Sequence, residues 1–238
     1  MPKYKPPRSN LGRSSFLAQA LDTGTKDRTA GNNFISQESL DNITNLLPSL
    51  EIAVSQVGSR LSVRAKEIRE RASAVGKTKR YLRDLWVVLK RRVERLEQPA
   101  EVLTYYQLPL DGLTPNPTAQ DEWLMLAEQV VKGDDRAVLA GYPPMTNPSA
   151  AELAEVLAAA KKESHDVAMA DREYDQAQET MAALRPQAAE LIAEVMAELR
   201  FNLRKKDAPS QRRIMRSYGA HFSYLKGEPP DPDNGEDE

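Results

Sequence analysis

Three glutamates spaced four residues apart form the most suggestive chemical group in the sequence. We expect Glu190, Glu194 and Glu198 on one face of a helix, because side chains at i, i+4 and i+8 lie above one another. A two-metal carboxylate centre in a helical bundle uses such glutamates, but it also needs Glu-x-x-His pairs on facing helices. The two histidines, His165 and His221, do not follow a glutamate at that spacing. We therefore interpret the glutamates as a solvated acidic face and predict no metal site.

The sequence contains few residues or motifs that could support covalent catalysis or bind a cofactor. It contains no cysteine, which removes thiol nucleophiles, thiolate metal sites and disulfides. Gly76-Lys77-Thr78 is similar to the end of a phosphate-binding loop, but that motif needs another glycine five residues earlier, where this chain has Arg71. Nucleophile-elbow and Gly-rich dinucleotide motifs are missing. We predict no catalytic residue and no cofactor, since an enzyme would need a pocket in residues 98–148 that the sequence does not reveal.

Charge is strongly segregated along the chain. Residues 60–95 contain thirteen basic and four acidic side chains, and residues 200–216 contain seven basic and one acidic. Residues 151–199 contain four basic and eleven acidic side chains, and residues 227–238 contain six acidic and none basic. Because opposite charges favour one helix pairing over another, this pattern predicts that the basic stretch 60–95 lies alongside the acidic one.

The second basic stretch is the better candidate for contact with an anion or a partner, because it has fewer acidic neighbours. Basic residues that follow a phosphate backbone bind nucleic acid in a salt-dependent way. The competing interpretation is a solvated helix end whose cations interact favourably with the helix dipole. The candidate residues are Arg204, Lys205, Lys206, Arg212, Arg213 and Arg216.

Apolar residues repeat every seven positions over a long stretch, which predicts a long helix over 36–97. A strict seven-residue repeat keeps one stripe against a partner only if the helices supercoil, as in a coiled coil. Pro48 and Gly76 are possible breaks, and a turn at Gly76 would give two shorter helices of a four-helix bundle. The expected packing seam consists of Leu40, Leu47, Val54, Leu61, Ile68, Val75, Leu82, Leu89 and Leu96.

A second long helix is predicted over 149–206. Ser149 is its expected N-cap, and Glu152 stands three residues later as in a capping box. This helix also has a seven-residue repeat, with smaller side chains that suit close packing against a bulkier neighbour. Its expected seam residues are Leu153, Val167, Tyr174, Met181 and Val195.

The remaining segments are shorter or irregular. Residues 1–35 are interpreted as a flexible basic arm with at most one or two helical turns. The Pro-rich connector 98–148 is expected to hold one short helix ending at Gly133 and another that Asp134 caps. Residues 207–225 are expected to be a basic terminal segment, and residues 226–238 a disordered acidic tail.

These predictions describe an all-α protein, either an elongated antiparallel helical hairpin or a four-helix bundle of long helices. Only 6% of the residues are aromatic and 29% are charged, which fits long solvated helices better than a large core. No transmembrane segment or secretory signal is recognisable, so we expect a cytoplasmic protein. The predicted function is a non-enzymatic structural or interaction protein that associates with itself or with another protein. The alternative is a module that binds nucleic acid or an anionic surface through its basic helical faces.

Overall fold

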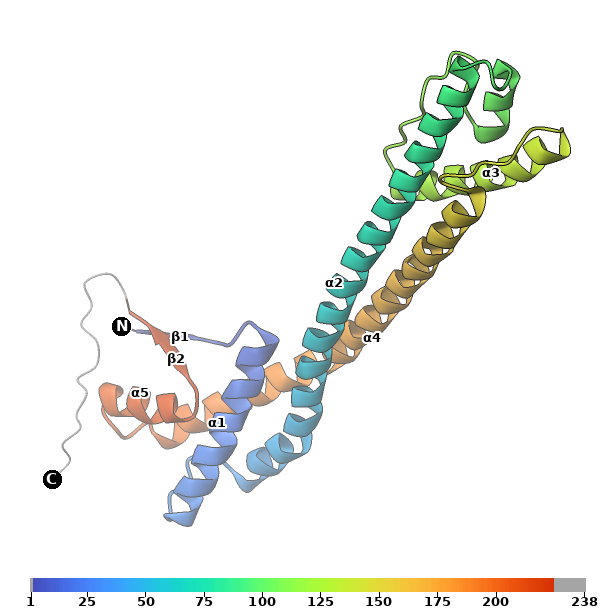
Figure 1. Cartoon of the computed structure of the whole chain (residues 1–238). Helices are drawn as coiled ribbons and strands as arrows, with labels where there is room; N and C mark the ends of the chain where they lie inside the picture. The colour runs from blue at the N-terminus through green and yellow to red at the C-terminus, as the bar shows by residue number, and fades with distance from the viewer. Residues whose placement is uncertain (1, 225–238) are drawn as a thin grey trace. The chain divides into compact units, whose positions relative to one another are not determined.

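The computed structural model describes residues 2–224 and confirms the all-α fold, with two long helices packed antiparallel (Figure 1). These are α2 (Gln37–Glu94) and α4 (Ala150–Asn202). Helix α2 is continuous through Pro48 and Gly76, and α4 is continuous through Pro186. The acidic tail expected over 226–238 lies outside the described residues. In residues 2–224, no helix combines the length and the apolar character that a bilayer crossing requires.

Side-chain caps define the starts of both long helices. The Ser149 hydroxyl accepts a hydrogen bond from the Glu152 amide at 3.1 Å, and the Glu152 carboxylate accepts one from the Ser149 amide at 2.7 Å. This is the predicted capping box. At the start of α2, the Ser36 hydroxyl accepts a hydrogen bond from the Ser39 amide at 3.0 Å. Each cap satisfies amide groups that have no partner within the helix.

The chain divides into two compact units, and α2 and α4 contribute to both. The first unit contains residues 2–60 and 174–224, and the second unit contains residues 61–173. The first unit adds β1 (Lys3–Lys5), α1 (Asn10–Thr29), α5 (Ala208–Ser217) and β2 (His221–Ser223) to its parts of the long helices. The second unit adds the 3-10 helix η1 (Ala100–Tyr106) and α3 (Gln120–Leu139).

The N-terminal segment is the largest departure from expectation, because residues 1–35 do not form a flexible arm. Helix α1 has 20 residues, and the Ser9 side chain caps it by accepting a hydrogen bond from the amide of Gly12. Phe16, Leu17 and Ala20 are at most 2% exposed in the core of the first unit. Packing of these side chains, rather than intrinsic propensity, stabilises the helix.

The two ends of the described chain meet in a small antiparallel ribbon. Strands β1 and β2 pair with Tyr4 opposite Phe222 and Lys5 opposite His221. Alternate residues of a strand point to opposite faces, so Tyr4 and Phe222 pack on the core of the first unit while Lys3 and Lys5 are exposed. Three-residue strands give too short a pattern to be predicted from sequence.

Helix α5 and the residue after it are attached to α1. Tyr218 is fully buried, and its hydroxyl donates a hydrogen bond to the Asp27 carboxylate at 2.7 Å. Burial raises the pKa of Tyr218 above its ordinary value, and the hydrogen bond to Asp27 raises it further. Thr23 donates a second hydrogen bond, at 2.7 Å, to the backbone carbonyl of Ser217. The basic terminal segment is therefore an integral part of the first unit up to the end of the described chain.

In the second unit, one helix replaces the two short helices expected around Gly133. The interpretation of Gly133 as a terminator is wrong, because α3 runs through it and the backbone of Tyr105 packs directly against it. A Cβ atom at this position would lie 1.8 Å from the Tyr105 carbonyl oxygen. Asp134 caps nothing. Its buried carboxylate accepts hydrogen bonds from the Tyr106 hydroxyl at 2.6 Å and the Met145 amide at 3.0 Å.

The predicted packing seam is buried only in part. Leu40, Leu47, Val75, Leu82 and Leu89 are buried in the two cores, and Val54 is half-buried. On α4, the expected seam residues Leu153, Val167, Met181 and Val195 are buried and Tyr174 is half-buried.

Three members of the seam do not pack as expected. Leu61 and Ile68 are 46% and 43% exposed, because they lie outside both core clusters and a single neighbouring helix covers only one side of α2. Leu96 is 91% exposed because it lies after the end of α2, with a left-handed φ of 59°.

Candidate interaction surfaces

The acidic face predicted on α4 is partly occupied by contacts within the chain. The Glu198 carboxylate accepts hydrogen bonds from the Ser36 amide at 2.7 Å, the Ser36 hydroxyl at 2.8 Å and the Ser39 hydroxyl at 3.0 Å. Glu198 therefore holds the start of α2. The other two glutamates, Glu190 and Glu194, are exposed at the edge of a groove in the first unit.

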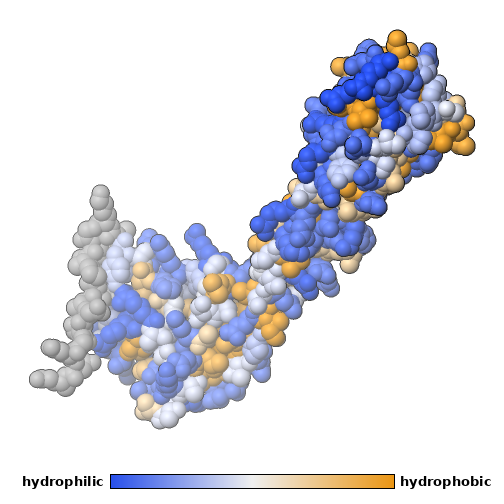
Figure 2. Space-filling view, in the orientation of Figure 1, coloured by the Kyte–Doolittle hydropathy of each residue, from blue (hydrophilic) through white to orange (hydrophobic). Residues whose placement is uncertain are grey.

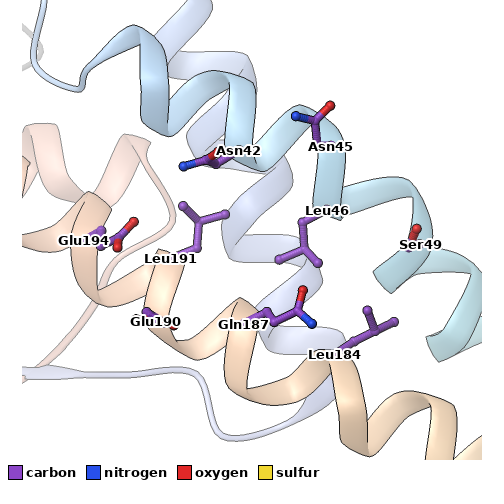
Figure 3. A pocket seen from close by; sticks show the side chains of 9 residues that line it. All are labelled: Asn42, Asn45, Leu46, Ser49, Leu184, Gln187, Glu190, Leu191 and Glu194. Carbon is purple, nitrogen blue, oxygen red and sulfur yellow. The ribbon is translucent and has the colours of Figure 1, made fainter.

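That groove lies between α2 and α4 and has a volume of about 430 Å³ (Figure 3). Leucine side chains from both helices point into the space between them, and amide, hydroxyl and carboxylate groups stand at its edges. The groove therefore offers hydrogen-bonding and carboxylate groups beside leucine side chains. Its lining residues are Asn42, Asn45, Leu46, Ser49, Leu184, Gln187, Glu190, Leu191 and Glu194.

One group of carboxylates in residues 2–224 is close enough together to hold a cation. It consists of Glu67, Glu163 and Asp166 in the second unit, all half-buried, with oxygen atoms within 4.8 Å of one another. The Lys66 ammonium group lies 3.3 Å from a Glu67 oxygen, so a protein cation already supplies counter-charge. His165 is exposed beside this group. Spacing along the sequence does not predict this group, because its members come from two helices.

The clearest unpartnered feature of the second unit is an apolar strip on α2. We define the α2 strip as Leu61, Ala65, Ile68 and Ala72, which follow one another at intervals of four, three and four residues and so share one face of the helix. All four are exposed. Two large side chains alternate with two alanines, a pattern that suits the interdigitating surface of a second helix.

Ion pairs join α2 to its neighbours beside the α2 strip. Arg64 pairs with Asp171 of α4. Arg71 donates hydrogen bonds to the Ser164 hydroxyl at 3.2 Å and to the Asp121 carboxylate at 2.6 Å, where α3 begins. The predicted contact between the basic stretch of α2 and the acidic helix α4 is therefore present in the second unit.

A basic surface covers the ribbon and the end of α4 in the first unit. We define this basic surface as Lys3, Lys5, Arg200, Arg204, Lys205 and Lys206, all exposed. The guanidinium of Arg200 lies 5.6 Å from the centre of the Tyr4 ring, which places the end of α4 beside β1. The guanidinium of Arg204 lies 3.9 Å from the centre of the Phe201 ring, and Phe201 is 63% exposed.

The other predicted contact residues lie on α5. The Arg216 guanidinium lies 5.6 Å from the Phe222 ring centre and 5.8 Å from the Tyr224 ring centre, and it donates a hydrogen bond to the Tyr224 hydroxyl. Arg212 is half-buried and Arg213 is exposed. Hydrogen bonds donated by the Ser210 hydroxyl and amide lower the pKa of Asp207, and the charge of Arg213 lowers it further. Arg216 therefore packs within the first unit. Arg204, Lys205 and Lys206 are exposed, and the Arg204 guanidinium donates a hydrogen bond to the Phe201 carbonyl at 2.6 Å.

Most of the face seen in Figure 2 is hydrophilic, with smaller apolar areas in each unit. Over residues 2–224, the exposed side chains are mainly charged and apolar side chains carried by helices. Comparisons with protein-family models, curated proteins and solved structures found no match to this chain.

Proposed function

We propose that this chain is a non-enzymatic interaction protein that associates with a second copy of itself through the α2 strip. In the proposed dimer, the strip of each copy packs against α4 of the other copy. One observation carries the proposal. Leu61 and Ile68 belong to the same seven-residue repeat as Leu82 and Leu89, but Leu61 and Ile68 are exposed whereas Leu82 and Leu89 are buried.

Charge supports a second copy as the occupant of the strip. Residues 60–72 of α2 carry five basic and two acidic side chains, so the strip favours an acidic helix over a basic one. Residues 163–173 of α4 carry four acidic and one basic side chain, and one of the acidic ones, Asp171, already pairs with Arg64 of the same chain. A two-fold arrangement places each α2 strip on the partner's α4, and a two-fold interface repeats every contact.

The size of the strip predicts weak association. Twelve residues of helix, from Leu61 to Ala72, span about 18 Å, and two helices side by side are about 20 Å wide. The resulting footprint is about 360 Å² for each copy, roughly half of the 800 Å² that stable complexes bury on each partner. We therefore expect a dissociation constant on the order of 100 µM for contacts limited to this section.

Sedimentation velocity over a concentration series tests the proposal. From about 5 to about 500 µM protein, the average mass is expected to rise from the monomer value of 26.6 kDa toward the dimer value. Raising the salt concentration should weaken association, because the charges at this surface are exposed. Ile68→Lys should keep the protein monomeric across the range, because it places a charge in the middle of the strip.

Ile52→Lys is the matched control, because Ile52 is an equally large side chain on the same helix, is 59% exposed and lies off the strip. This variant should associate like the wild type. A wild-type chain that stays monomeric at the highest concentration would refute the proposal. So would an equal loss of association in the Ile52 and Ile68 variants.

A further inference from the structure

We infer that the basic surface of the first unit binds single-stranded nucleic acid. The inference goes beyond self-association, because it concerns a different unit and different side chains. It starts from a juxtaposition made by the fold: β1 pairs with β2, and Arg200 lies over Tyr4 of β1. Cations about 200 positions apart in the sequence are thereby carried by neighbouring segments of the first unit, with Arg200 on the Tyr4 face of β1 and the two lysines on its other face.

The acidic residues within 195–207 are engaged in contacts inside the protein. Glu198 accepts three hydrogen bonds from Ser36 and Ser39. Asp207 caps α5 by accepting a hydrogen bond from the Ser210 amide at 3.0 Å. These two carboxylates are engaged within the first unit, and the basic side chains near them, Arg200, Arg204, Lys205 and Lys206, are exposed. Such a surface attracts a polyanion because each cation that contacts a phosphate releases bound counterions from the nucleic acid.

The arrangement of the cations favours an extended ligand. Lys3 and Lys5 project from the same face of β1 and are separated by about 7 Å along the strand. Arg204, Lys205 and Lys206 follow one another in the turn after α4. A chain of phosphates can contact both groups in succession, whereas a single small anion can contact only one.

An exposed aromatic ring favours a single strand over a duplex. Phe201 is 63% exposed, and the Arg204 guanidinium lies 3.9 Å from the centre of its ring. An exposed ring beside a guanidinium offers a platform for an unpaired base, whereas the bases of a duplex are already stacked on one another. The end of α4 therefore provides both a ring for base stacking, Phe201, and cations for phosphate contact, Arg204–Lys206.

Fluorescence anisotropy with a labelled oligothymidylate of about 20 nucleotides tests the inference. If all six cations contact phosphates, raising the salt concentration from about 50 to about 200 mM should weaken binding about 300-fold, a log–log slope of about −4. Replacing Arg204, Lys205 and Lys206 together with glutamine should reduce that slope to about −2. Phe201→Ala should weaken binding about tenfold and leave the slope unchanged.

A second triple variant controls for net charge. Lys77, Arg80 and Arg91 are exposed on α2 in the second unit, and replacing them with glutamine removes the same charge. This variant should bind as the wild type does. A duplex of the same length should bind more weakly than the single strand.

Four results would overturn the inference: no salt-dependent binding at about 50 mM salt, equal losses in the two triple variants, tighter binding of the duplex, or binding confined to vesicles. The vesicles for this comparison contain phosphatidylcholine with about 30% phosphatidylserine. Circular dichroism of each variant establishes that it has folded, so that a loss of binding can be assigned to the surface.

Discussion

Gly133 gives the sharpest test of how the second unit is packed. Helix propensity alone predicts that Gly133→Ala stabilises α3 by about 1 kcal/mol. The structure predicts the opposite, because the new Cβ would lie 1.8 Å from the Tyr105 carbonyl oxygen and ordinary contacts begin at 3.4 Å. The backbones of α3 and η1 must therefore separate by about 1.6 Å. Such a shift breaks the hydrogen bond, now 2.6 Å long, between Tyr106 and Asp134.

The expected cost combines two effects. Overpacking in a close-packed interior costs about 2 kcal/mol, and loss of a buried hydrogen bond to a charged group costs about 2 kcal/mol. After the gain of about 1 kcal/mol in helix propensity, we expect the free energy of unfolding to fall by about 3 kcal/mol. Neither effect is visible in the sequence around Gly133, which shows only a glycine inside a helical pattern.

Urea unfolding followed by tryptophan fluorescence measures this change. Both tryptophans, Trp86 and Trp123, are buried in the second unit, so their emission reports on that unit. Gly76→Ala is the matched control, because Gly76 also lies inside a helix of the second unit and a Cβ there would meet only Arg80, at 4.0 Å. The control should be stabilised by about 0.5 to 1 kcal/mol. A Gly133→Ala protein as stable as the wild type would refute the close approach of η1 to α3.

Two further predictions concern carboxylates. Glu198→Ala should lower the free energy of unfolding of the first unit by about 1 to 2 kcal/mol, because the Ser36 amide and hydroxyl lose the carboxylate that accepts their hydrogen bonds. Urea unfolding followed by circular dichroism measures this change. The control Glu194→Ala, one helical turn away, should change the free energy of unfolding by less than about 0.5 kcal/mol. Hydrogen bonds from Lys132 and Lys161 lower the pKa of Glu128 from 4.5 to about 2, so these ion pairs should be intact above pH 4.5 and lost as the pH falls toward 2. An NMR titration of Glu128 with a midpoint near 4.5 would contradict this.

The sequence was most informative where structure is determined locally. The capping box of Ser149 and Glu152 depends on residues three apart, and the structure contains both of its hydrogen bonds. The long helices were predictable because a seven-residue repeat over many turns is a strong signal. The opposite charges of α2 and α4 correctly indicated their antiparallel neighbours, as the Arg64–Asp171 pair illustrates.

Elements that depend on contacts between distant parts of the chain cannot be predicted from local sequence patterns. Helix α1 is rich in Ser, Thr and Gly, and its stability comes from Phe16 and Leu17 packing in a core built by other segments. Strands β1 and β2 are each three residues long and lie about 200 positions apart in the sequence, so their pairing depends on the rest of the first unit. Glycine commonly ends helices, and nothing near Gly133 in the sequence indicates that the backbone of Tyr105 lies against it.

The partly exposed seam shows what periodicity can and cannot predict. A seven-residue repeat states that Leu61, Ile68, Leu82 and Leu89 share one face of α2, but it does not state what covers that face. Leu82 and Leu89 belong to the core of the second unit, while Leu61 and Ile68 have no such cover. A single exposed aliphatic side chain is ordinary on a protein surface, and Ile52 is an example. A buried repeat that continues into a row of exposed residues is less common. The comparison of association by Ile68→Lys and Ile52→Lys therefore distinguishes a binding surface from an isolated exposed side chain.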